Sequence, residues 1–186
     1  MMLITTSRRP SRRTRSFIRD LFRVIPGSKR VNRGKSNISD LCLKALREGL
    51  NRVLIVETKY GNPSAFIFIL VNPDKTYKHL SEVTIRSVTL RREMTSKRVP
   101  NIEGLCLAFL EQAPPQNEII EALRIGFGVD TVHRISDIED LKGEVEEDVA
   151  FVISSSRSTF YYVPTGMELG PRMKFKKGRI WVKEEQ

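Results

Sequence analysis

The spacing of hydrophobic residues predicts a strand followed by a helix at the beginning of the chain. Residues 3–6 are short and rich in β-branched side chains, which favours a strand. Ser11 follows Pro10 and is suited to cap a helix, and Pro26-Gly27 is suited to end it. Between them, apolar residues recur every three or four positions and predict one buried helix face, made of Phe17, Ile18, Leu21, Phe22 and Ile25.

A second helix and several strands are predicted in the next 60 residues. Residues 28–35 form a short strand that runs into a loop. Asn37 and Asp40 have the spacing of a helix cap and its partner, and Gly49 is a natural helix end. Apolar runs then predict buried strands at 52–58 and 64–71, and the segment 76–93 supplies one or two more.

The character of the sequence changes around residues 95–101, after which a strand-helix-strand pattern begins again. The predicted elements are a strand at 104–110, a helix at 114–128, a strand at 131–138, an acidic loop at 140–148 and strands at 149–156, 159–166 and 172–183. The sequence therefore predicts an α/β fold of two similar lobes, each a mixed sheet with packed helices. We expect the lobes to span residues 1–98 and 99–186.

Length and composition indicate a folded protein. The chain has 186 residues, of which 40% are hydrophobic, enough to build a core. The longest apolar run, 65–71, is far shorter than the ~18 residues that a membrane span needs, and the basic N-terminus lacks the apolar stretch of a signal peptide. We expect a cytoplasmic protein that does not engage a membrane. Cys42 and Cys106 have apolar neighbours and are interpreted as core thiols.

The positive charge is concentrated at one end of the chain. The net charge is +10, and the first 35 residues hold eleven basic groups against one acid, Asp20. Arg12, Arg15, Arg19 and Arg23 are three or four residues apart, so they form a stripe opposite the apolar face of the predicted helix. Like charges at this spacing repel one another, which favours a polyanionic partner over a merely solvated face.

Arginine predominates among these cations, and its planar fork engages phosphate oxygens in pairs and stacks on bases. RNA or DNA is therefore favoured over an anionic membrane, whose surface helices typically combine lysine with an inserting aromatic face. The candidate RNA-binding residues are Arg8, Arg9, Arg12, Arg13, Arg15, Arg19, Arg23, Lys29, Arg30, Arg33 and Lys35, with Arg172 near the other end of the chain.

No catalytic or metal constellation is evident in the sequence. The "RGKS" at 33–36 lacks the glycine that a phosphate loop needs five residues before Gly34. His79 and His133 have no cysteine or carboxylate at ligand spacing, and "ISSSRS" at 153–158 lacks the glycines of a nucleophile elbow. The acidic residues at 139–148 are interpreted as a solvated loop. We expect a protein that is not an enzyme and holds no cofactor or metal.

A second, weaker basic cluster lies near the C-terminus. It consists of Arg172, Lys174, Lys176, Lys177 and Arg179, accompanied by Tyr161, Tyr162 and Trp181. Aromatic side chains stack on bases, which favours an RNA contact. Alternation along the strand separates Met173, Phe175 and Trp181 from the lysines, which favours a place in the core instead. Both interpretations stay open at this point.

Four segments, taken in order, resemble the Brix domain of ribosome-biogenesis proteins. They are "ITTSRRPSRRTRSFIRDL" at 4–21, "RVNRGKSNISDL" at 30–41, "YGNPSAFIF" at 60–68 and "ELGPRMKFK" at 168–176. The chain is most similar to the compact archaeal form of the subgroup that works in the small-subunit processome in eukaryotes. Its "YGNPSAF" departs from the His-Leu-Pro-Tyr-Gly-Pro-Thr pattern of many eukaryotic relatives.

The resemblance implies one Brix-like domain over residues 1–186, with two lobes each similar to the anticodon-binding domain of class II aminoacyl-tRNA synthetases. It also implies a non-enzymatic role in pre-rRNA processing and subunit assembly, with ribosomal RNA and ribosomal or assembly proteins as partners. By position, the arginines between Ser7 and Arg15 and the stretch Arg30–Lys35 would form the RNA surface. The alternatives are a module for tRNA or another structured RNA, a nuclease or nucleotide hydrolase, and a scaffold for an acidic protein.

Overall fold

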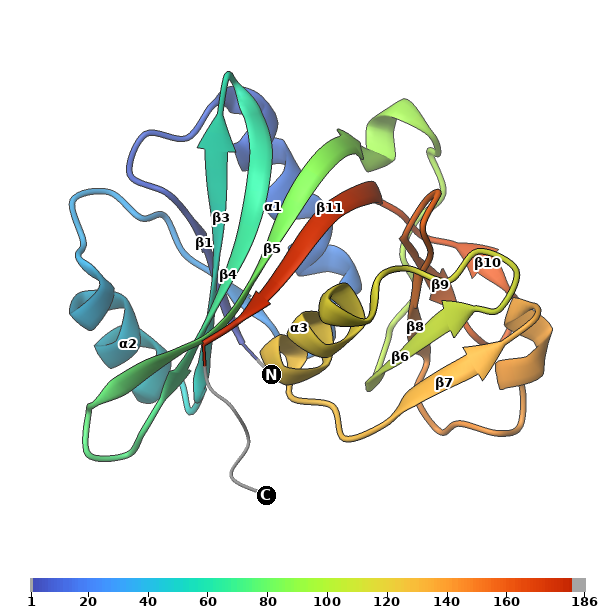
Figure 1. Cartoon of the computed structure of the whole chain (residues 1–186). Helices are drawn as coiled ribbons and strands as arrows, with labels where there is room; N and C mark the ends of the chain where they lie inside the picture. Colours follow the sequence, from blue (N-terminus) through green and yellow to red (C-terminus); the bar gives the residue numbers. More distant parts are fainter. Residues whose placement is uncertain (1, 182–186) are drawn as a thin grey trace.

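The computed structural model describes residues 2–181 and contains two mixed sheets packed side by side (Figure 1). The first sheet has the strand order β11-β5-β4-β3-β1-β2, and the second has the order β10-β9-β8-β6-β7. The elements of the first sheet are β1 (Leu3–Thr6), α1 (Arg12–Val24), β2 (Lys29–Arg30), α2 (Ile38–Arg47), β3 (Arg52–Lys59), β4 (Asn62–Val71), β5 (Tyr77–Thr89) and β11 (Arg172–Ile180). Those of the second are β6 (Leu105–Leu110), α3 (Asn117–Phe127), β7 (Val132–Ile135), η2 (Ile138–Leu141), β8 (Val149–Ile153), β9 (Thr159–Tyr162) and β10 (Met167–Glu168), and η1 (Arg91–Glu93) precedes β6.

The two sheets repeat one connectivity. In the first, β1 lies parallel to both β2 and β3, and β4 and β5 then continue antiparallel. In the second, β6 lies parallel to both β7 and β8, and β9 and β10 continue antiparallel. A helix follows the first strand of each unit, α1 in one and α3 in the other. The expectation of two similar α/β units is therefore met in topology, whereas the likeness to the anticodon-binding domain stays a prediction.

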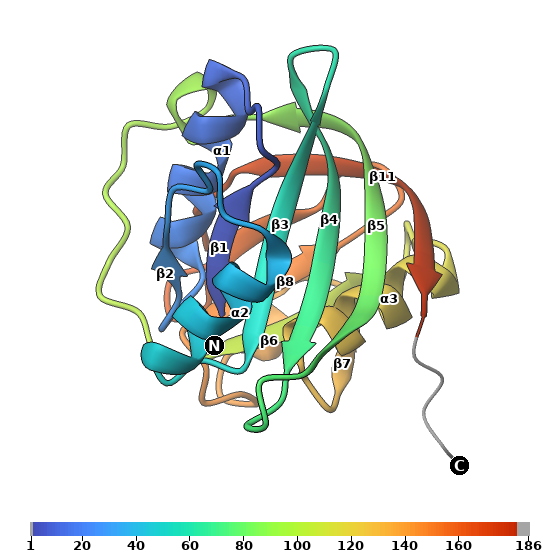
Figure 2. The ribbon, with the colours of Figure 1, turned by 90° about the vertical axis from the view of Figure 1, so that its left-hand side faces the viewer.

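One continuous hydrophobic core joins both units. It contains Phe17 from α1, Phe66 and Phe68 from β4, Leu123 from α3 and Phe151 from β8, all fully buried. The helices α1 and α3 both contribute to this core, and α3 lies between the two sheets (Figure 1). The outer faces carry smaller cores, one under α2 and one under η2. Figure 2 shows α2 lying across the outer face of the first sheet.

The last strand, β11, returns to the first sheet. It pairs antiparallel with β5 and packs against α3, although it follows the second unit in the chain. Gly178 makes this possible because a Cβ there would lie 2.1 Å from the carbonyl oxygen of Glu118. The division of the chain into lobes at 1–98 and 99–186 stays a prediction. The strand β11 does not follow it, because β11 lies beyond residue 98 and yet belongs to the first sheet. Val182 and Lys183, predicted to extend this strand, lie outside the described residues.

Most of the predicted local elements are confirmed. Ser11 caps α1 through a 3.0 Å hydrogen bond from the Thr14 N–H, and Asn37 and Asp40 form the expected capping box on α2. The segment 76–93 holds one strand and the 3₁₀ turn η1. The acidic loop predicted at 140–148 overlaps the end of η2, where Leu141 is buried against the outer face of the second sheet. None of the described helices has the length and hydropathy that crossing a membrane requires.

Candidate nucleic-acid interface

Helix α1 divides its residues between the core and the solvent. Phe17, Ile18 and Leu21 are buried against the first sheet, in agreement with the predicted apolar face. Arg12, Arg15, Arg19 and Arg23 are exposed on the other side. Phe22 differs from its prediction because it is 43% exposed and lies next to Arg23 rather than in the core. The arginine stripe therefore exists as a surface, which we call the α1 arginine face.

The first turn of α1 strengthens the positive potential of this face. It contains no acidic residue, so the partial positive charge of the helix N-terminus is not offset locally. Of the twelve predicted RNA-binding residues, those with no ion pair within residues 2–181 are Arg8, Arg9, Arg12, Arg15, Arg19, Arg23, Arg30, Arg33 and Lys35. Nine of the twelve predicted RNA-binding side chains thus lack a carboxylate partner in the part of the chain that the structure describes.

Three predicted RNA-binding residues are instead held by carboxylates. Arg13 forms a two-pronged ion pair with Glu93 and also donates a 2.8 Å hydrogen bond to the Val88 carbonyl. The hydrogen bond from Arg13 lowers the pKa of Glu93. Lys29 pairs with Glu48 at the surface. Arg172 is the third of these residues, and like Arg13 it forms a two-pronged ion pair, in this case with Glu168.

The Arg172 pair joins β10 to the start of β11. Its Nε and Nη2 atoms donate to the two carboxylate oxygens of Glu168 at 2.8 and 2.7 Å. The hydrogen bond raises the pKa of Arg172 and lowers that of Glu168. These contacts stabilise the fold at positions where the sequence suggested an RNA contact.

Two neighbouring hollows lie along the α1 arginine face. One, of about 420 Å³, is lined by Arg8, Arg15 and Arg33 together with backbone and apolar groups around Gly34. The other, of about 550 Å³, is lined by Arg12, Arg15 and Arg19 from α1, by Arg30, and by Arg92. Arg30 at the end of β2 and Arg33 in the loop after it thus lie on one surface with the helix, while their contact with RNA stays a prediction.

Arg33 holds the loop after β2 in place. Its Nε donates to the Ser36 carbonyl at 2.9 Å and its Nη1 donates to the Thr6 carbonyl at 3.4 Å. Burial, followed by the nearby charge of Arg8, lowers the pKa of Arg33. Two cations that repel each other at the rim of one hollow favour an anion between them. Arg9 and Lys35 are exposed nearby but line neither hollow.

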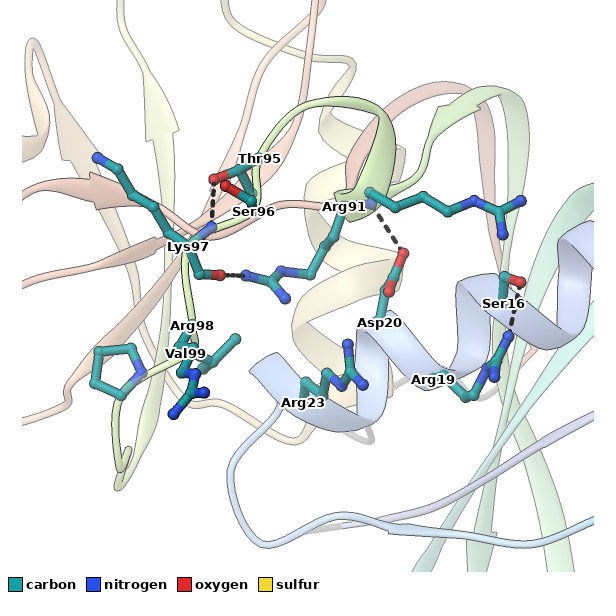
Figure 3. Close-up of a pocket in the computed structure, with 12 residues that line it drawn as sticks. Ser16, Arg19, Asp20, Arg23, Arg91, Thr95, Ser96, Lys97, Arg98 and Val99 are labelled. Carbon is teal, nitrogen blue, oxygen red and sulfur yellow. Dashed lines mark hydrogen bonds between the residues drawn. The ribbon is translucent and has the colours of Figure 1, made fainter.

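A third and larger hollow, of about 690 Å³, lies between α1 and the segment 91–100 (Figure 3). We call it the linker pocket, because this segment connects the two sheets. Its basic residues are Arg19, Arg23, Arg91, Arg92, Lys97 and Arg98, and its hydroxyl groups come from Ser16, Thr95 and Ser96. Its one carboxylate belongs to Asp20.

Asp20 and Arg91 form the floor of the linker pocket. Asp20 is 7% exposed and accepts a 2.9 Å hydrogen bond from the Arg91 backbone N–H. Burial raises its pKa, against the opposing effects of that hydrogen bond and of the surrounding arginines. Arg91 is 6% exposed, and its side chain donates to the carbonyls of Leu169 at 2.6 Å and Lys97 at 2.9 Å. Both buried groups therefore serve the fold of the pocket wall.

The basic residues from the linker are functional candidates that the sequence analysis missed. After residue 35 the charges of the chain sum to zero, which concealed a local excess. Residues 86–98 contain Arg86, Arg91, Arg92, Lys97 and Arg98 against the single acid Glu93. A local count of charge would have found this segment, but its position beside α1 depends on the tertiary structure.

The C-terminal basic cluster is divided between core and surface. Met173 and Phe175 are buried, as the interpretation in terms of core packing expected. Trp181 is 38% exposed and contacts His79 at 5.5 Å between ring centroids, with the Arg179 guanidinium 5.6 Å from its ring centroid. These residues line none of the three hollows described above. Among residues 2–181, no group of three His, Cys, Asp or Glu side chains is placed to hold a metal ion.

Comparisons with known proteins give a consistent result. A probable Brix domain-containing ribosomal biogenesis protein of Methanococcus maripaludis is 34% identical over 182 residues, which cover 96% of this chain and 98% of that protein. The protein of the same name from Pyrococcus horikoshii is 47% identical over 97 residues, or 52% of this chain. That match spans only 43% of the Pyrococcus protein. No protein-family model matches the chain.

A solved structure supports the same relationship. The crystal structure of a probable ribosomal biogenesis protein from Aeropyrum pernix superimposes with a TM-score of 0.74 at 29% identity, covering 98% of each chain. The resemblance seen in the sequence motifs is thereby confirmed over nearly the full length. The similarity in sequence and in fold covers nearly the whole chain, and the chain belongs to the Brix domain-containing ribosomal biogenesis proteins.

Proposed function

We propose that this protein is an rRNA-binding ribosome biogenesis factor that acts in pre-rRNA processing and subunit assembly without catalysing a reaction. The observation that carries the proposal is the α1 arginine face, with its two adjoining hollows. Arg12, Arg15 and Arg19 are exposed there without carboxylate partners among residues 2–181, although carboxylates pair with three other predicted cations. The names of the relatives, all probable ribosomal biogenesis proteins, support the same role.

The chemistry of this surface is suited to holding an RNA conformation. Guanidinium groups bind phosphate oxygens in pairs, and the spacing along α1 presents a new group at about each helical turn. Phosphate contacts position the protein, so its selectivity comes from the shape of the RNA and from a few base contacts. The protein would thus stabilise one arrangement of a folded pre-rRNA while the subunit matures, with ribosomal or assembly proteins as further partners.

A salt titration tests the proposal. The experiment determines the affinity of the full chain for folded rRNA fragments at salt concentrations between about 50 and 300 mM, a range that includes the physiological concentration. If about five phosphates are neutralised, the logarithm of the affinity falls against the logarithm of the salt concentration with a slope of about −3.5 to −4.5. An affinity that does not respond to salt would contradict the proposal, because the arginines would then not engage phosphates.

The alternative is a module for tRNA or another structured RNA, because the α1 arginine face carries the same phosphate chemistry for any folded RNA. Competition between rRNA fragments and bulk tRNA at fixed salt separates the two functions. A preference for rRNA fragments supports the biogenesis role. Equal or better competition by tRNA favours the alternative.

A further inference from the structure

We infer that the linker pocket binds two negative phosphate charges held close together on one RNA. Such a pair of charges occurs on a terminal phosphate, or where the backbone turns sharply enough to bring two phosphodiesters together. The inference rests on the proposed RNA-binding function. It adds that the closely spaced phosphate charges bind in the linker pocket and not on the rest of the α1 arginine face. It concerns the residues that the linker brings to α1, above all Arg92, Lys97 and Arg98.

The charge inside the linker pocket exceeds what one phosphodiester neutralises. Of its six basic residues, Arg91 is committed to the Leu169 and Lys97 carbonyls. The other five, Arg19, Arg23, Arg92, Lys97 and Arg98, have no ion pair within residues 2–181. A phosphodiester carries one negative charge and a terminal phosphate carries about 1.5 to 2. A closely spaced pair of charges is therefore the better electrostatic match.

The one acid in the linker pocket, Asp20, offsets at most one of its positive charges. Asp20 is buried, and its carboxylate accepts the Arg91 backbone N–H. Burial raises the pKa of Asp20, which disfavours its charged form. Figure 3 shows Asp20 directed towards Arg91, with the arginines of α1 and of the linker around it.

The wall of the linker pocket is preorganised by contacts that do not involve its exposed cations. The Arg91 guanidinium holds the carbonyl of Lys97, and the Lys97 N–H donates to the Thr95 hydroxyl at 3.1 Å. These hydrogen bonds use the backbone of Lys97, so its side chain stays available. A wall fixed in advance loses less conformational entropy when the ligand binds. The hydroxyls of Ser16, Thr95 and Ser96 add neutral donors for phosphate oxygens.

The first experiment measures pyrophosphate and inorganic phosphate binding to the full chain by calorimetry at fixed ionic strength. Pyrophosphate presents two adjacent phosphate groups and is expected to bind more tightly than inorganic phosphate. The double variant Lys97→Ala, Arg98→Ala removes two exposed side chains and is expected to weaken pyrophosphate binding about tenfold or more. The matched control Lys78→Ala, Arg86→Ala removes the same charge from exposed positions of β5 outside the three hollows and is expected to leave it unchanged.

The second experiment compares one short RNA with a 5′-phosphate, a 3′-phosphate or hydroxyl ends. Tighter binding of a phosphorylated form, abolished in the Lys97→Ala, Arg98→Ala variant, assigns the linker pocket to a terminal phosphate. Equal binding of the three forms, with pyrophosphate competing for a folded RNA, assigns it to a turned backbone. Thermal melting of each variant verifies that it is folded.

The inference is overturned if pyrophosphate binds no better than inorganic phosphate, or if the linker-pocket and control variants lose its binding equally. In either case a different measurement, the salt dependence of binding to folded RNA, decides whether the proposed function holds. Salt-dependent binding of folded RNA that requires Arg12 and Arg15, which do not line the linker pocket, would leave that function in place.

Discussion

The backbone N–H of Arg91 donates a 2.9 Å hydrogen bond to Oδ2 of Asp20, across 71 residues of sequence. This contact fixes the C-terminal half of α1 against the beginning of the linker between the sheets. It also explains the single acidic residue in the basic N-terminal segment. Asp20 is buried and accepts a backbone donor, and among residues 2–181 it forms no ion pair with Arg19 or Arg23, although its charge acts on both. The arginines around it consequently remain available to a ligand.

Replacing Asp20 therefore tests a structural role. We expect Asp20→Ala to lower the free energy of unfolding by about 1–3 kcal/mol, because it leaves a buried N–H without an acceptor. Asp20→Asn is the matched control, since its amide oxygen can still accept the hydrogen bond, and we expect a loss smaller than that of Asp20→Ala. Urea denaturation followed by circular dichroism measures both. Equal stability of Asp20→Ala and the wild type would show that the contact does not support the fold.

The triple variant Arg12→Ala, Arg15→Ala, Arg19→Ala tests the α1 arginine face. These side chains are exposed and have no ion pairs within residues 2–181, so their removal is expected to leave the unfolding free energy nearly unchanged. The affinity for folded RNA is expected to fall at least tenfold, and the salt slope to decrease in magnitude by about 2–3. Fluorescence anisotropy at several salt concentrations measures both quantities. Unfolding of the triple variant would assign these arginines to the structure instead.

Arg13→Ala provides a contrast on the same helix. Arg13 holds Glu93 and the Val88 carbonyl, so we expect this single change to destabilise the protein by about 1 kcal/mol. RNA affinity, measured well below the melting temperature, is expected to change less than in Arg15→Ala. If Arg13→Ala weakened RNA binding as strongly as Arg15→Ala without affecting stability, the pair with Glu93 would have to open when RNA binds.

Gly178→Ala tests the packing that joins β11 to α3. The added Cβ would lie 2.1 Å from the backbone oxygen of Glu118, and a backbone atom cannot move away as a flexible side chain could. We expect a loss of about 3 kcal/mol or more in the free energy of unfolding. Chemical denaturation measures it. Gly34→Ala is a reference without steric conflict, because no atom lies within 4 Å of its added Cβ, although its positive φ of 54° still imposes backbone strain.

The pair of Glu168 with Arg172 makes stability depend on pH at the acidic end. The hydrogen bond from Arg172 lowers the pKa of Glu168 below its ordinary value of 4.5. The stabilisation is therefore present above pH 4.5 and is lost as the pH falls through the lower folded-state pKa. Glu168→Gln is expected to be less stable than the wild type by about 1 kcal/mol at pH 7, with a smaller difference at pH 3. A constant difference between the two proteins at both pH values would contradict this assignment.

Local patterns were sufficient to predict most helices and strands. The apolar spacing of Phe17 and Leu21, the cap at Ser11 and the capping box at Asn37 act within a few residues, and each is confirmed. Phe22 did not follow its spacing, since its side chain is 43% exposed although the apolar pattern of the helix includes it. The return of β11 to the first sheet had no local signal, since it depends on contacts with β5 far away in the sequence.

The sequence by itself determined that one end of the chain is strongly basic and that its arginines occupy one side of a helix, because helical spacing and charge are local properties. Only the tertiary structure decided which cations remain available. Arg13 meets Glu93 across 80 residues, whereas Arg92, Lys97 and Arg98 arrive beside α1 from the linker. Pairing and convergence of charges depend on distances in space, and those distances are set by the packing of the two sheets around their shared core.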